Sequence, residues 1–149
     1  MLKSIAFFIF FYFNHIGPTM AYEEPTYTIL KSTGVYEIRY YGDRLAVQTL
    51  QTSGEDGAFR RLFKYISGEN QTASKIAMTV PVLKSDEGSG LTMYFFLPKS
   101  YSKLNTPLPK ANNVKLVTVK GGHFAVIKYS GRSTNKRNKK YANVLENAL

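Results

Sequence analysis

The chain has 149 residues, a formal net charge of +10 at pH 7, and neither cysteine nor tryptophan. The absence of cysteine excludes disulfides, cysteine nucleophiles and thiolate metal sites. Without its first 21 residues the chain keeps about 128 residues, which is the size of a single domain that can bury a core.

Residues 1–21 have the pattern of a secretory signal peptide. Lys3 gives a positive start, Ile5 to Phe13 form an apolar core, and Thr19-Met20-Ala21 places small residues before a cleavage site. The apolar run is shorter than the roughly 20 residues that a spanning helix needs. We expect cleavage after Ala21 and an exported, periplasmic or secreted protein whose domain covers residues 22–149.

The rest of the chain alternates short strand patterns with two helical ones. The pattern predicts strands over 27–30, 35–41 and 45–52, a helix over 57–67, and a strand hairpin over 76–84 and 91–97. A loop to residue 113 is followed by strands over 114–119 and 124–129 and by a polar helix over 135–148.

The segment GAFRRLFKYISGENQTASKIAMTVPV, from Gly57 to Val82, holds the strongest local pattern. Its apolar residues recur at helical spacing and Gly68 follows them as a stop, which predicts an amphipathic helix packed on a sheet. The run KIAMTVPV has strand character, and Pro81 restricts that strand to an edge, an end or a bulge. The apolar stripe consists of Ala58, Phe59, Leu62, Phe63 and Ile66.

Charge is distributed unevenly. From Lys99 onward eleven lysines and arginines face a single acid, Glu146, whereas acids and bases nearly balance in the preceding part of the domain. A basic half attracts anionic ligands, lipid headgroups or nucleic acid, and it also fits a solvated face that only aids solubility. We expect no nucleic-acid partner, because no aromatic RNA-binding motif or zinc-finger spacing is present and an exported protein rarely meets nucleic acid.

No catalytic arrangement is apparent. His123 is the only histidine after residue 21, so a cysteine–histidine nucleophile and a multi-histidine metal site are excluded within this domain. The acids lack the spacing of a carboxylate pair, and no phosphate-binding loop or dinucleotide fingerprint occurs. The sequence therefore predicts a protein that is not an enzyme.

The order GAFRRLFKYISGEN followed by KIAMTVPV resembles the SOUL haem-binding protein family, which has a phenylalanine-rich helix, a G-x-N turn and an I-x-M-T-x-P-V strand. Glu23–Tyr27 and Tyr36–Tyr41 look like the family's opening strands, and Met93–Pro98 and Ala125–Gly131 look like two later strands. The resemblance covers Tyr22 to Gly131, nearly all of the expected domain.

The resemblance implies an α+β fold, a distorted antiparallel β-barrel of duplicated strand–helix–strand repeats with two flanking helices. A weak internal echo between Gly34–Gly42 and Gly122–Gly131 agrees with such a duplication. Relatives continue beyond the second helix into a final strand pair, whereas this sequence stops at Leu149. We therefore expect an incomplete second repeat with an exposed edge, and either self-association as a homodimer or marginal stability.

The resemblance also implies haem or a related tetrapyrrole as the ligand, held at the first helix and nearby strands. Haem needs an apolar slot, cations for its propionates and, for tight ligation, an axial donor. Lys64 matches a basic residue that the family has there and is the first propionate candidate. The predicted binding residues are Phe59, Leu62 and Phe63 as the apolar wall, Arg60 and Lys64 for the propionates, and Tyr40 and Met78.

Axial ligation has only weak candidates in the sequence. Tyr40 stands where some animal relatives carry a histidine, and tyrosinate can ligate ferric haem. His123 is the other candidate, while Met78 has the position of ordinary strand core filler. Relatives that hold haem mainly by apolar contact, without a histidine ligand, fit this sequence better.

Two further functions stay open. The basic half is suited to docking on anionic lipid or polysaccharide. A pocket of this fold is also suited to another amphipathic small molecule, because a fold does not by itself fix a ligand.

Overall fold

The computed structural model describes residues 22–51, 57–86 and 90–149, so the predicted signal segment lies outside the described residues. All hydrogen-bonded strand pairs are antiparallel, and the predicted α+β class is confirmed. No helix in the described ranges is long and apolar enough to cross a membrane. The elements are β1 (Tyr27–Ser32), β2 (Glu37–Tyr41), β3 (Arg44–Leu50), α1 (Gly57–Ile66), β4 (Leu83–Asp86), β5 (Leu91–Phe96), β6 (Lys115–Val119), β7 (Gly122–Val126) and α2 (Asn135–Ala148).

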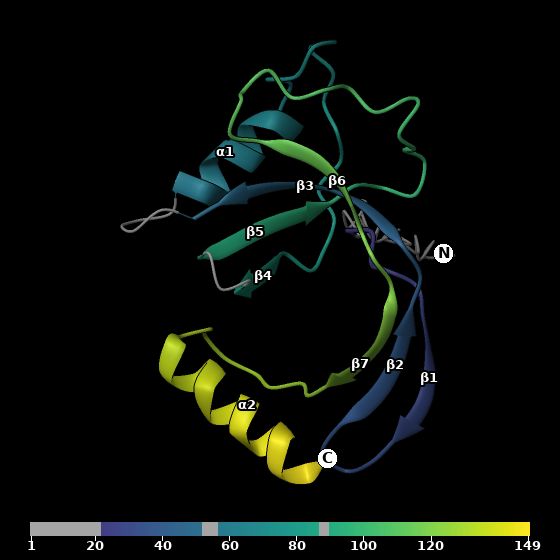
Figure 1. Ribbon diagram of the computed structural model, residues 1–149, viewed down its shortest axis with the longest axis vertical. Helices are drawn as coiled ribbons and strands as arrows, with labels where there is room; N and C mark the ends of the chain where they lie inside the picture. The colour runs from purple at the N-terminus through teal and green to yellow at the C-terminus, as the bar shows by residue number, and fades with distance from the viewer. Residues whose placement is uncertain (1–21, 52–56, 87–89) are drawn as a thin grey trace, which may run out of the picture.

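The strands form a three-stranded sheet, β1-β2-β7, and a four-stranded sheet, β4-β5-β3-β6. Two bent chain segments run from one sheet into the other. In the first, β2 continues into β3, and in the second, β6 continues into β7. Tyr41 pairs with Gly122 on one side of the bend, and Arg44 pairs with Val119 on the other. Figure 1 shows the resulting arch. The described strands form two open sheets, so the predicted barrel closure stays a prediction.

The bend is fixed by a glycine and a carboxylate. A Cβ atom at Gly121 would overlap the carbonyl oxygen of Tyr41, so only glycine allows the two backbones to approach this closely. The carboxylate of Asp43 accepts hydrogen bonds from the Gly121 amide (2.9 Å) and the Lys120 ammonium (2.8 Å). These two donors, Lys120 first, lower the pKa of Asp43.

The main core lies between α1 and one face of the four-stranded sheet. Alternate strand residues point to opposite faces, so Val47 and Phe95 meet α1 whereas Ala46 and Phe96 form a smaller cluster on the other face. The α1 core comprises Val47, Ala58, Leu62, Tyr65, Ile66, Ile76, Met93, Phe95, Leu97 and Val114.

Two predicted strands differ most from the observed ones. The strand predicted over 76–84 begins only at Leu83, because Pro81 has no amide donor and the Ile76 amide donates to the Ile66 carbonyl (2.8 Å) instead of to a neighbouring strand. The strand predicted over 124–129 is β7, which begins two residues earlier, at Gly122, and ends at Val126. The bounds predicted for the second helix match α2, which buries none of its residues and stands apart from both sheets (Figure 1).

Candidate functional site

An exposed aromatic pair distinguishes α1 from a purely structural helix. Ala58, Leu62, Tyr65 and Ile66 are buried, whereas Phe59 and Phe63 keep 39% and 49% of their surfaces exposed. Their rings, one helical turn apart, stack with centroids 6.0 Å apart, and Phe59 meets Phe95 edge-on at 5.1 Å. The helix therefore presents two aromatic rings to solvent beside its buried face.

The G-x-N turn after α1 returns the chain to the helix. Asn70 is fully buried, and its amide donates to the carbonyls of Tyr65 (3.0 Å) and Ser74 (2.7 Å). Its side-chain oxygen accepts from the Ser74 amide (3.1 Å). The first bond satisfies a carbonyl that the end of the helix leaves unpaired, and the others close the loop. Asn70 thereby places the following segment, Ile76 to Met78, against α1.

A groove of about 590 Å³ opens between the end of α1 and this returning segment. Its volume lies within the range of small-molecule sites, about 300 to 1,000 Å³. The lining is mainly apolar, with one cation, Lys75. It consists of Tyr22, Phe63, Ile66, Ser67, Lys75, Ile76, Ala77 and Met78.

Tyr22 reaches this groove through a backbone bridge that joins distant parts of the sequence. Glu23 forms an isolated parallel bridge with Thr79, in which the Val80 amide donates to the Glu23 carbonyl (3.0 Å). The Glu23 carboxylate also accepts from the Lys99 amide (2.9 Å). The residue next to Tyr22 is therefore tied to two other segments, while the Tyr22 side chain stays 59% exposed.

A smaller cavity of about 290 Å³ lies beside the bend of the arch, with Arg44, Phe96 and Tyr101 in its lining. Two of its acids, Glu23 and Asp43, already accept hydrogen bonds from protein groups. The Arg44 guanidinium lies over the Phe96 ring at 3.7 Å, and burial lowers the pKa of Arg44. Because this cavity is half as large and its polar groups are partly satisfied, the groove at α1 is the better candidate site for a flat, apolar ligand.

The predicted residues of the α1 region separate into three groups. Phe63 and Met78 line the groove together, while Phe59 stacks on Phe63 next to it. Leu62 is fully buried behind them in the core. Lys64 is an exposed residue that pairs with Glu69 at 3.3 Å and does not line the groove, and Arg60 is exposed as well.

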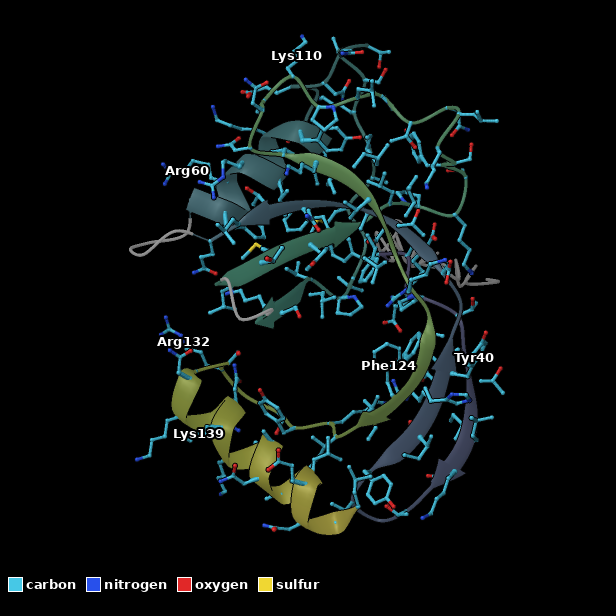
Figure 2. All side chains as sticks on the ribbon, viewed as in Figure 1. Tyr40, Arg60, Lys110, Phe124, Arg132 and Lys139 are labelled. Carbon is cyan, nitrogen blue, oxygen red and sulfur yellow. The ribbon has the colours of Figure 1, made fainter. Side chains whose placement is uncertain are left out.

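Tyr40 and His123 lie in the three-stranded sheet, away from α1. They are register partners on β2 and β7, with ring centroids 5.3 Å apart, and both are exposed. Figure 2 shows Tyr40 on the outer side of the arch, far from Arg60 on α1. The structure thus does not bring either weak axial candidate to the groove.

Sequence reasoning missed Tyr22 and Lys75 as groove residues. Lys75 directly precedes the apolar run Ile76–Met78, so its position beside the motif was an available signal. Tyr22 offered no local signal, because it reaches the groove only through the pairing of residue 23 with residue 79.

The chemistry of the groove fits a tetrapyrrole. Phe63, Ile66 and Ile76 supply apolar walls for a macrocycle, Lys75 supplies a cation for a propionate, and Tyr22 and Met78 supply oxygen and sulfur donors. In the part of the chain that the structure describes, no cluster of three or more histidine or acidic side chains could hold a metal ion.

A family model matches most of the chain. No curated protein matches the chain. The family model described as SOUL heme-binding protein matches residues 22–149, which is all of the chain after the predicted signal segment. The match includes the helix, the G-x-N turn and the returning segment that build the groove, and it supports haem or a related tetrapyrrole as the small-molecule ligand. The chain belongs to the SOUL heme-binding protein family.

Proposed function

We propose that the groove between α1 and residues 75–78 binds haem or a related tetrapyrrole. The observation that carries this proposal is the exposed aromatic pair of α1 beside a mainly apolar groove of about 590 Å³. Large exposed apolar surface costs free energy unless a ligand or partner covers it. A flat apolar macrocycle covers such a surface and leaves its propionates at the solvent edge.

Phe63 and Met78 form the apolar walls, and Phe59 extends the wall through its stack on Phe63. Lys75 lines the groove, so we propose it as propionate partner ahead of Lys64, which already has Glu69. Arg60 remains a candidate for the outer propionate.

Haemin titration of the full chain tests the site. Phe63→Ala should weaken haemin binding by about tenfold, the value of one good aromatic contact. Phe124→Ala is the matched control, because Phe124 is similarly exposed (44%) but lies on β7 (Figure 2). Equal affinities for the two variants would contradict the proposed site.

A lysine pair separates the two propionate assignments. Lys75→Gln should lower haemin affinity more than Lys64→Gln, because only Lys75 lines the groove. The opposite order would return the propionate site to the outer face of α1.

The protein is proposed to hold its ligand without transforming it, after export to the periplasm or the cell exterior. The signal pattern of residues 1–21 supports export. N-terminal sequencing of protein from the native host should begin at Tyr22. Soluble protein in the cytoplasm that keeps Met1 would contradict this proposal.

We propose further that the arch is an open version of the expected barrel and that its three-stranded sheet self-associates. Every residue of β1 is exposed, which leaves an edge strand available for pairing. Light scattering should detect a dimer. A concentration-independent monomer would contradict self-association.

A second candidate function is docking on anionic lipid through α2. Lys136, Lys139 and Lys140 are exposed, and none of the described ion pairs involves them. Figure 2 shows Lys139 on the side of α2 that points away from both sheets, and Arg132 just before the start of the helix. Such a cation cluster attracts anionic headgroups at about 1 kcal/mol per lysine.

Vesicle binding tests this second function. Changing Lys136, Lys139 and Lys140 together to Gln should weaken binding to phosphatidylserine vesicles by about 100-fold, at about 1 kcal/mol each. The same triple change at Lys84, Lys103 and Lys110 keeps the net charge equal and should have a smaller effect. Equal losses would show that net charge alone matters. Salt-insensitive binding would contradict an electrostatic mode.

A further inference from the structure

Among the described residues that line the groove, two side chains are of the types that commonly ligate haem iron in proteins. These are the Tyr22 hydroxyl and the Met78 thioether, and no histidine lies in its lining. The two ligand candidates of the sequence, Tyr40 and His123, lie on the other sheet. Any direct protein ligand to iron in this groove must therefore be sought at Tyr22 or Met78.

The Met78 side chain already packs against the core. It is half-buried and lies against the main core cluster, whereas the Tyr22 side chain is 59% exposed. The Tyr22 hydroxyl makes no hydrogen bond within the described part of the chain, so turning it toward a ligand breaks no existing bond. Ferric iron also prefers a hard, anionic oxygen donor to a soft thioether.

The backbone around Tyr22 is held although its side chain is not. The pairing of Glu23 with Thr79 and the bond from the Lys99 amide to the Glu23 carboxylate fix the chain one residue away. Lys75 lines the same groove and supplies its one cation. A tethered backbone lowers the entropy that the ring must lose when it engages a ligand.

Resting on the function proposed above, we propose that Tyr22 is the axial ligand of ferric haem in this groove. The phenolic O–H bond breaks, its proton passes to water, and an oxygen lone pair forms the bond to ferric iron, with no change of oxidation state. The groove thereby selects ferric haem over metal-free tetrapyrroles, because only the iron complex gains this bond.

Paired titrations of the full chain with haemin and with metal-free protoporphyrin test the proposal. Tyr22→Phe should lower haemin affinity by about 10- to 100-fold or more, since even a group that only supports a metal ligand contributes this much. Protoporphyrin affinity should stay unchanged, because the ring is kept. Wild-type protein with haemin should show a phenolate-to-iron charge-transfer band and enhanced tyrosine modes in resonance Raman spectra, and Tyr22→Phe should lose both.

Matched variants keep the ligand assignment separate from the groove itself. Tyr40→Phe, His123→Ala and Met78→Leu should retain the charge-transfer band. Retention of the band in Tyr22→Phe, or its loss only in one of the other variants, overturns the assignment of Tyr22 while leaving the groove as a haem site. If wild-type protein binds neither ligand saturably, the proposed function and the ligand assignment fail together.

Discussion

The two helices of this protein carry similar patterns and have different roles. α1 has the apolar stripe described above, and the otherwise polar α2 carries Tyr141, Val144 and Leu145 at helical spacing. Yet α1 buries four of its ten residues and α2 buries none of its fourteen. α1 packs on the four-stranded sheet, whereas Tyr141 of α2 only stacks on the nearby Tyr129, with centroids 4.2 Å apart. An amphipathic pattern therefore predicts that a helix forms, but it does not predict what the helix packs against.

The difference also separates the stability of the fold from its surface properties. α1 contributes the core on one face and an edge of the groove on the other, so changes in this helix affect folding and ligand binding together. α2 is held mainly by local contacts, including bonds from Tyr129 to Asn138 and from Arg137 to the Ser130 carbonyl. Because α2 buries none of its residues, deleting it should leave the core residues buried.

The largest expected effect is a contrast between two leucines. Leu62→Ala removes a fully buried side chain of α1 and should lower the free energy of unfolding by about 2–5 kcal/mol. Leu145→Ala makes the same change on α2, where the side chain is half-buried, and should cost less than about 1 kcal/mol. Urea unfolding measures both. Equal losses would show that α2 packs into a core in solution.

A smaller effect is expected at alkaline pH. Tyr65 of α1 is buried and donates to the Pro107 carbonyl (2.7 Å), and burial raises its pKa from 10.0 to about 12. The unfolded chain ionises Tyr65 first, so its contribution to stability is complete below about pH 10 and is lost as the pH rises toward about 12. Tyr65→Phe should cost about 1 kcal/mol at neutral pH and flatten this alkaline loss.

Urea midpoints across that pH range, with Tyr141→Phe on α2 as the control, measure the effect. The control should keep the steep alkaline decline of the wild-type protein. If the alkaline decline in stability persists unchanged in Tyr65→Phe, other tyrosines cause it.

The sequence predicted the helix bounds of α2 and the family, because each depends on local pattern or on one contiguous motif. The predicted site stays a prediction, and Phe63 and Met78 line the groove proposed for it. The sequence did not predict the irregular path before Leu83. Apolar composition favoured a strand there, but Pro81 lacks an amide donor and the Ile76 amide bonds to the end of α1. The apolar run Ile76–Met78 lines the groove instead of forming a strand.

The contribution of Tyr22 could not be predicted for a different reason. Its position depends on a bridge between residues 23 and 79, and no periodicity or spacing encodes a pairing at that separation. The sequence also could not predict that the two sheets stay open, for the same reason. Strand patterns predict that segments pair, whereas closure into a barrel depends on which edges meet.

The smallest expected effect concerns the start of α2. Thr134 is the N-cap, and its hydroxyl accepts from the Arg137 amide (3.3 Å). Thr134→Ala should destabilise the helix locally by about 1 kcal/mol, and therefore speed amide exchange in α2 by about fivefold. Because α2 contributes no buried residue, the global unfolding midpoint should stay unchanged. Thr134→Ser keeps a capping hydroxyl and should restore slow exchange. A global shift in Thr134→Ala would mean instead that α2 is docked in solution, on this chain or on a second copy, and that the contrast between the two helices is smaller than the fold indicates.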